Sequence, residues 1–174
     1  MAKLHRLKTF VDGDIFRIVV ESPRGSTIKL KHDPDLDIFT ISRPLPLGLT
    51  YPCDWGFVPS TKGPDGDPID AAVYWDTATF PGVVIACRAI AVIKVEQNTP
   101  DGSGERRRND RIVAVPVEAR RQSDLTGASD LPKRVRDELE HFFVSAAALE
   151  GKDPTVLGWD GPASALALIR SSPA

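Results

Sequence analysis

Short hydrophobic blocks separated by polar turn residues fill the first two thirds of the chain, and this pattern predicts β-strands. Val, Ile and aromatic residues, which favour strands, concentrate in six segments: residues 15–20, 28–31, 37–41, 71–75, 83–95 and 111–117. Clusters of Pro and Gly at 22–26, 43–48 and 62–68 separate several of them as turns. Several short strands divided by such turns predict a β-barrel or a β-sandwich.

The last third of the chain has helical spacing. From Leu131 to Leu149, apolar residues recur every three or four positions, which predicts a helix that Asp130 caps at its start and Gly151 at its end. A second short helix is predicted near Pro162, and its apolar residues are Ala165, Leu166, Leu168 and Ile169. Residues 97–110, QNTPDGSGERRRND, are predicted to form an exposed loop with a solvated charge run. The fold class predicted is α+β, mainly β: a barrel with two packed C-terminal helices.

Composition adds limits to this picture. The chain has 174 residues, 41% hydrophobic and 26% charged, which suits a single soluble domain over residues 1–174. The net charge of −2 gives no basic excess for nucleic acid. The N-terminus is too polar for a signal peptide, and the most apolar stretch, 81–95, is too short to span a bilayer, so we expect a cytoplasmic protein without a membrane partner. Cys53 and Cys87 are expected to be small buried hydrophobes rather than a disulfide.

The segment GPDGDPID at 63–70 places three carboxylates, Asp65, Asp67 and Asp70, within six positions. In an extended segment Asp65 and Asp67 would point to the same side, because side chains alternate. Converging carboxylates suit a hard cation such as Mg²⁺, which prefers oxygen ligands. Asp, Gly and Pro also form plain surface turns, so both interpretations stay open. An EF-hand is a poor alternative, because its sixth position requires Gly and is Asp70 here.

The stretch YPCDWGFVPSTKGPDGDPIDAAVYW (51–75) resembles the signature region of the soluble family I inorganic pyrophosphatases. The similarity continues in segments 18–31, 81–95, 112–117, 130–143 and 148–152, and so covers the chain from about residue 15 to 170. This resemblance implies a five-stranded, OB-like β-barrel with helices packed outside. It also implies Mg²⁺-dependent hydrolysis of pyrophosphate to two phosphates, in a homo-oligomer that is often a hexamer in bacteria.

Roles for individual residues follow from the resemblance. Asp65 and Asp70 correspond to metal ligands, and Asp67 to the residue that binds or deprotonates the attacking water. Glu21 corresponds to an acidic residue near the metals. The phosphate-binding cations implied are Lys29, Arg43 and Arg111, where Arg111 replaces a lysine of the family.

Several positions depart from the family pattern. Lys31 replaces a glutamate, Trp55 a tyrosine, and Gln97 and Asn109 two aspartates. Ala146 and Ala147 stand where a tyrosine–lysine pair contacts phosphate in the family. The loop after residue 97 is longer than usual, so we consider Asp101, Glu105 and Asp110 as substitute carboxylates, and residues 106–108 as substitute cations.

Two hypotheses from different classes follow. The first is a working pyrophosphatase with an altered or weakened site, which the intact DGDPID favours and which we adopt. The alternative is a catalytically impaired relative that binds a phosphate-containing ligand or a protein partner, or acts on another phosphoanhydride, which the five substitutions at 31, 97, 109, 146 and 147 favour. A nucleic-acid-binding barrel has little support, since basic excess and runs of aromatics between cations are both missing from the sequence.

Overall fold

A closed ring of five strands forms the centre of the computed structural model, which describes residues 3–99 and 101–174. The ring strands, in the order in which they pair, are β2 (Ile15–Ser22), β5 (Asp54–Phe57), β6 (Asp70–Val73), β9 (Arg111–Pro116) and β7 (Val84–Asn98). The first half of β7 returns to pair with β2 and closes the ring. All these pairs are antiparallel except β6 with β9, which is parallel.

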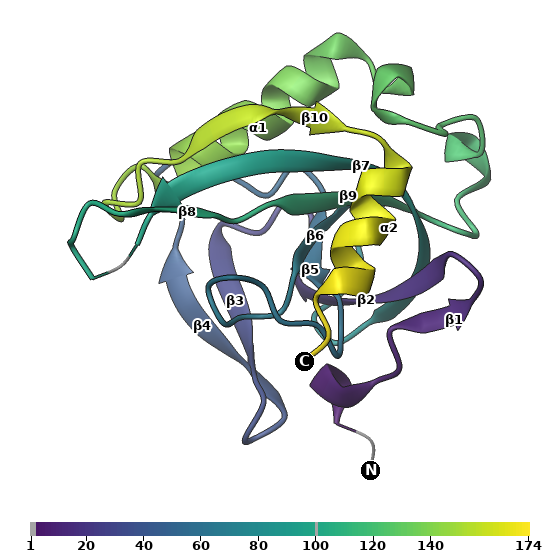
Figure 1. Cartoon of the computed structure of the whole chain (residues 1–174), viewed down its shortest axis with the longest axis horizontal. Coiled ribbons are helices and arrows are strands. Elements are labelled where there is room, and N and C mark those ends of the chain that lie inside the picture. Colours follow the sequence, from purple (N-terminus) through teal and green to yellow (C-terminus); the bar gives the residue numbers. More distant parts are fainter. Residues whose placement is uncertain (1–2, 100) are drawn as a thin grey trace.

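The remaining elements are attached to the ring (Figure 1). β1 (Phe10–Asp12) pairs with β2, whereas β8 (Arg106–Arg108) and β10 (Thr155–Asp160) both pair with β7. β3 (Ile28–Asp33) and β4 (Ile38–Pro44) form a separate hairpin that projects from the ring. The helices are α1 (Lys133–Ala147) and α2 (Pro162–Ser171), and three 3₁₀ turns are η1 (Leu4–Arg6), η2 (Arg120–Gln122) and η3 (Ala128–Asp130).

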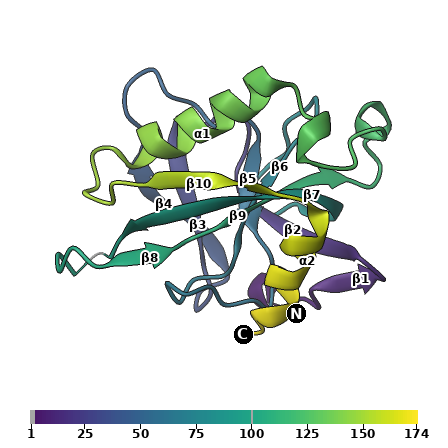
Figure 2. The same ribbon diagram turned by 45° about the horizontal axis from the view of Figure 1, so that its top comes forward.

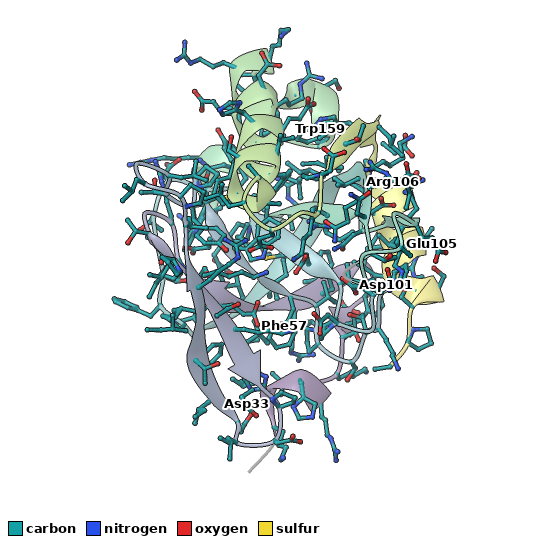
Figure 3. All side chains as sticks on the ribbon, turned by 90° about the vertical axis from the view of Figure 1, so that its left-hand side faces the viewer. Asp33, Phe57, Asp101, Glu105, Arg106 and Trp159 are labelled. Carbon is teal, nitrogen blue, oxygen red and sulfur yellow. The ribbon has the colours of Figure 1, made fainter. Side chains whose placement is uncertain are left out.

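Buried apolar residues hold the ring and the helices together. In β2, Phe16 and three consecutive aliphatic residues at 18–20 have no exposed surface, because this strand is covered on both faces. α1 buries Leu139, Phe142 and Phe143 in a cluster that includes Trp55. This helix runs beside β10 and β7 (Figure 2). The indole Nε1 of Trp159 in β10 donates a 2.6 Å hydrogen bond to Glu140 of α1 (Figure 3).

Gly56 sets how closely β5 approaches β2. A Cβ atom at this position would lie 1.9 Å from the carbonyl oxygen of Val19. Any other residue would therefore force the two strands apart, so glycine is required by the pairing itself.

The predicted fold class is confirmed, and all six predicted strands exist. Four short strands were missed: β1, β5, β8 and β10. The exposed loop predicted over 97–110 was wrong at residues 97–98, which belong to β7, and at residues 106–108, which form β8. The second helix was predicted correctly. Each cysteine is free and buried, and Cys53 and Cys87 pack in separate core clusters, as expected.

The predicted ends of the first helix were wrong. α1 begins at Lys133, and the Asp130 carboxylate instead accepts hydrogen bonds from the amides of Thr126 and Gly127. At the other end α1 stops at Ala147, so Gly151 does not cap it. Among the described residues, no helix combines the length and hydrophobicity needed to cross a membrane.

Candidate active site

A cavity of about 250 Å³ opens beside the ring and the β3–β4 hairpin. Its walls come from η1, β2, β3, β5, β6, β7, β8 and β9, from the turn that precedes β6, and from the segment after α1 that carries Lys152. The charged side chains that line it are four carboxylates, Glu21, Asp65, Asp67 and Asp70, and five cations, Lys29, Lys31, Arg107, Arg111 and Lys152. The cavity therefore offers binding groups for both cations and anions.

The DGDPID segment is a tight turn, not the extended strand considered above. Gly66 has φ +89°, a left-handed conformation that favours glycine. The amide of Asp67 donates to Asp65 Oδ1 at 3.2 Å, and the amide of Gly63 donates to the carbonyl of Asp67 at 2.7 Å. This turn brings Asp65, Asp67 and, at the start of β6, Asp70 to one cavity.

The surroundings of two carboxyl groups in the cavity, Glu21 and Asp65, disfavour their negatively charged form. The pKa of Glu21 is raised to about 7: burial is the largest cause and Asp70 adds to it, whereas the 2.7 Å hydrogen bond from the amide of His32 acts in the opposite direction. Burial also raises the pKa of Asp65 above its usual range, and Asp70 and Asp67 add to this. Neighbouring carboxylates whose pKa values rise in this way fit a bound cation, which would remove their repulsion.

Lys31 binds the middle aspartate of the turn. Its Nζ lies 3.0 Å and 2.8 Å from the two carboxylate oxygens of Asp67. Burial lowers the pKa of Lys31, but the hydrogen bond and the charge of Asp67 outweigh it and raise that pKa overall. The Lys31 ammonium group therefore binds the carboxylate that, by resemblance to the family, would contact the attacking water.

Three other cavity cations, Lys29, Arg111 and Lys152, lie on the side near the end of α1. Burial lowers the pKa of Lys29 and of Lys152, and neighbouring cations add to both shifts. Lys152 and Arg43 both form ion pairs with Glu150. Arg111 lies across the parallel pair from Asp70, with Nε 3.6 Å from Asp70 Oδ2. These cations surround a space suited to an anion.

Comparison with known proteins decides the family. A family model described as "Inorganic pyrophosphatase" matches residues 18–174. The chain belongs to the inorganic pyrophosphatase family. It is 35% identical over 172 residues to the inorganic pyrophosphatase of Thermus thermophilus, covering 95% of this chain and 94% of that protein. It is also 37% identical over 158 residues to that of Nostoc sp., covering 91% and 89%.

Solved pyrophosphatase structures have the same fold. The crystal structure of the Thermus thermophilus inorganic pyrophosphatase matches with a TM-score of 0.88 and 34% identity over 98% of this chain and 96% of that chain. The Helicobacter pylori pyrophosphatase matches with a TM-score of 0.84 and 30% identity over 95% of each chain. The OB-like fold implied by the resemblance is thereby confirmed. Inorganic pyrophosphatases of this family are metal-dependent hydrolases of a phosphoanhydride bond.

The substituted pyrophosphatase positions lie at the site. Gln97 and Asn109 line the cavity. Trp55, Ala146 and Ala147 line an adjoining pocket of about 60 Å³ that also contains Arg43. The two alanines supply neither the hydrogen-bond donor nor the charge of the family pattern, and the cations of that pocket are Lys29, Arg43, Arg111 and Lys152.

The substitute carboxylates considered from sequence lie elsewhere. The Asp110 carboxylate accepts a 3.0 Å hydrogen bond from the amide of Val95 and forms an ion pair with Arg108 at 2.7 Å. Asp101 and Glu105 lie on the loop between β7 and β8, at the outer edge of the molecule (Figure 3). None of the three acids lines the cavity, so the structure does not place them where a carboxylate is missing.

The three consecutive arginines of β8 have different partners. Arg107 lines the cavity. Arg106 donates instead to the carbonyl of Glu96 at 3.1 Å and to Thr155 Oγ1 at 2.8 Å, and Arg108 holds Asp110. One of the three substitute cations considered from sequence therefore reaches the site.

Sequence reasoning missed three further groups at the site: Tyr51, Glu150 and Lys152. Lys152 follows Gly151 directly, in the segment ALEGK that contributed to the resemblance. It was missed because nothing in its local sequence distinguishes it from an ordinary surface lysine, and only the fold brings it to the cavity. Burial raises the pKa of Tyr51 to about 12, so its hydroxyl remains protonated in the pocket beside Arg43.

Proposed function

We propose that this chain hydrolyses inorganic pyrophosphate to two phosphates with Mg²⁺ as its metal, at an altered site. The observation that carries the proposal is the cavity in which four carboxylates face five cations. Its carboxylates suit a hard metal, and its lysines and arginines suit the phosphate groups of the substrate. Membership of the pyrophosphatase family supports the same reaction.

The metal would be held by Asp65, Asp70, Glu21 and Asp67, whose oxygens are the ligands that Mg²⁺ prefers. When bound, Mg²⁺ would lower the pKa of the attacking water and screen the charge that develops on phosphate.

Asp67 is the proposed general base. Its side chain is 57% exposed, so a water molecule has access to its carboxylate. Lys31 binds both oxygens of this carboxylate, but each oxygen keeps a second lone pair that can accept the proton of a water molecule. If Lys31 leaves Asp67, its ammonium group would be free to contact the phosphate.

Lys29, Arg43 and Arg111 are the proposed phosphate-binding residues, with Lys152 and Arg107 beside them. The fork of an arginine can bind two phosphate oxygens, whereas a lysine acts as a point charge. Burial lowers the pKa of Lys29 and of Lys152, and repulsion from neighbouring cations adds to both shifts: from Lys152 and Arg43 at Lys29, and from Arg43 and Arg111 at Lys152. A bound phosphate would relieve this repulsion, which favours binding of the substrate and of its product.

Two observations favour the second hypothesis, a catalytically impaired relative. Lys31 occupies the proposed base, and two carboxylates of the family pattern are the amides Gln97 and Asn109. Fewer negative ligands weaken metal binding. Such a chain would still bind a phosphate-containing ligand through its cations.

The test is phosphate release from pyrophosphate in millimolar Mg²⁺ by the wild-type chain and by Asp67→Asn, which preserves the shape of the side chain. Loss of a general base should lower the rate by roughly 10²- to 10⁴-fold. Asp14→Asn is the control, because Asp14 pairs with Arg170 at the surface. If wild type releases no more phosphate than Asp67→Asn, the hydrolase proposal fails, and calorimetry with phosphate then tests the binding hypothesis.

A homo-oligomer, a hexamer if the bacterial pattern holds, and a cytoplasmic location complete the proposal. Exposed apolar side chains, including Ile41, Leu47 and Phe80, support association between copies. Sedimentation velocity measures the assembly directly. The two free cysteines are compatible with a reducing compartment.

A further inference from the structure

Two histidines and an aspartate meet where the N-terminal turn η1 touches the β3–β4 hairpin. One ligand atom each of His5, His32 and Asp37 lies within 4.8 Å of the others. Both histidines also line the cavity described above. We propose that His5, His32 and Asp37 bind one transition-metal ion of the zinc class, at a site separate from the magnesium-binding carboxylates.

His32 and Asp37 already hold one another in place. His32 Nε2 lies 2.9 Å from Asp37 Oδ1, and the histidine is 5% exposed. The rings of Phe39 and Phe57 lie 5.3 Å and 5.6 Å from the imidazole and fix its orientation. Asp37 Oδ1 also accepts a 3.2 Å hydrogen bond from the amide of Leu4. A metal ion at this point would take the place of the proton shared by His32 and Asp37.

His5 supplies a nitrogen atom that lacks a partner. Its Nδ1 is buried and makes no hydrogen bond with any of the described residues. A buried polar atom without a partner costs free energy, and a metal ion at Nδ1 would remove that cost. The neutral ring would then carry its proton on Nε2. This breaks only a 3.3 Å hydrogen bond from Arg6, whose side chain is exposed and free to move.

The donor set selects the class of metal. Two imidazole nitrogens and one carboxylate oxygen suit Zn²⁺ and its neighbours, whereas Mg²⁺ prefers oxygen ligands alone. Ligand atoms about 2.1 Å from a tetrahedral zinc ion lie roughly 3.4 Å apart. The 2.9 Å distance between His32 Nε2 and Asp37 Oδ1 must therefore increase by a few tenths of an ångström. The His5 ligand atom, which lies within 4.8 Å of the other two ligand atoms, must move closer to them. Three protein ligands leave one position open for water or an anion.

A metal ion here would add a bond between parts of the chain that already touch, where the Leu4 amide donates to Asp37 and Lys3 Nζ to the carbonyls of Pro34 and Asp35. It would attach η1, which carries His5, to the hairpin that carries His32 and Asp37. His32 also donates its amide to Glu21 at 2.7 Å. The zinc-class site would thus lie directly beside the carboxylates proposed to bind magnesium, with different ligands.

The test is a Co²⁺ titration of the full chain after treatment with a chelator, followed by visible absorption. Zn²⁺ is colourless, and Co²⁺ in a four-coordinate site of nitrogen and oxygen ligands absorbs visible light. We expect one equivalent of Co²⁺ to give these bands and Zn²⁺ to abolish them. His5→Ala and Asp37→Asn should each weaken binding at least about 10-fold. His141→Ala, which removes the exposed histidine of α1, and Asp65→Asn should retain the bands.

The same experiment can overturn the proposal. If His5→Ala binds Co²⁺ as tightly as wild type, or if wild type gives no bands, the site does not exist. Histidine ring signals in NMR provide a second measurement that needs no variant: Zn²⁺ should shift those of His5 and His32 and leave that of His141 unchanged. Shifts at all three rings, or at none, would also overturn it. Neither readout depends on pyrophosphate hydrolysis, so failure of that activity and failure of this site are distinguishable.

Discussion

Lys31→Met tests whether the ammonium on Asp67 competes with the metal. Lys31 binds both oxygens of a carboxylate that is also a proposed Mg²⁺ ligand. Methionine preserves most of the length of the side chain and removes its charge. We therefore expect the variant to bind Mg²⁺ more tightly than wild type.

The magnitude follows from simple electrostatics. A unit charge and a divalent ion 4 Å apart repel each other by about 2 kcal/mol in water, which corresponds to roughly 30-fold in affinity. Water is the appropriate medium, because the side chains of Lys31 and Asp67 are 48% and 57% exposed. For the same reason the ion pair itself contributes at most about 1 kcal/mol to folding. The free energy of unfolding without metal should therefore hardly change.

Calorimetric titration with Mg²⁺ measures the affinity, and the Mg²⁺ midpoint of phosphate release measures its effect on activity. Lys94→Met is the matched control, since Lys94 pairs with Asp160 at 2.9 Å with similar exposure and does not line the cavity. An unchanged midpoint in Lys31→Met would refute the competition. A higher midpoint would assign Lys31 to substrate binding instead.

Two further predictions concern stability. Asp54 is fully buried and accepts hydrogen bonds from the amide of Arg24 and from the amide and hydroxyl of Thr79. Asp54→Ala should therefore lower the free energy of unfolding by about 3 kcal/mol or more, as measured by urea denaturation. The control is Asp14→Ala, which should cost under about 1 kcal/mol, and equal losses in the two variants would contradict the prediction. The pKa of Glu21 rises on folding from 4.5 to about 7, so the stability that Glu21 contributes is full below pH 4.5 and is lost as pH rises through 7 in the metal-free protein. Its stability relative to Glu21→Gln should fall by about 3 kcal/mol as pH rises from 4.5 to 7, and urea titrations in EDTA that give a flat difference would contradict this.

The strands that the sequence predicted share a local cause, and those it missed do not. β2, β7 and β9 are rich in β-branched residues that pack on both faces of the ring. β5 contains Gly56 and β10 contains Gly158, and neither residue favours a strand by itself. Those two segments are extended because neighbouring strands pair with them. The residues that determine their conformation are therefore those of the partner strands, elsewhere in the chain.

The candidate site divides in the same way. The DGDPID turn was visible in sequence because its carboxylates are adjacent. The contact between Lys31 and Asp67 joins residues 36 positions apart, so only the folded chain reveals it. His5 and His32 likewise have no spacing that indicates a shared metal, because η1 and β3 meet through tertiary packing.

The parallel pairing of β6 with β9 has a consequence for folding. Asp70 begins β6 and Arg111 begins β9, and the chain between them must traverse β7 and β8 before the two strands meet. Pairing between segments so distant in sequence forms late, because loop-closure entropy opposes it. A partly folded chain with only its local hairpins would therefore have the acidic turn without its guanidinium partner. Enzymatic activity should return during refolding only when the ring closes, which makes turnover a direct report on the last long-range step.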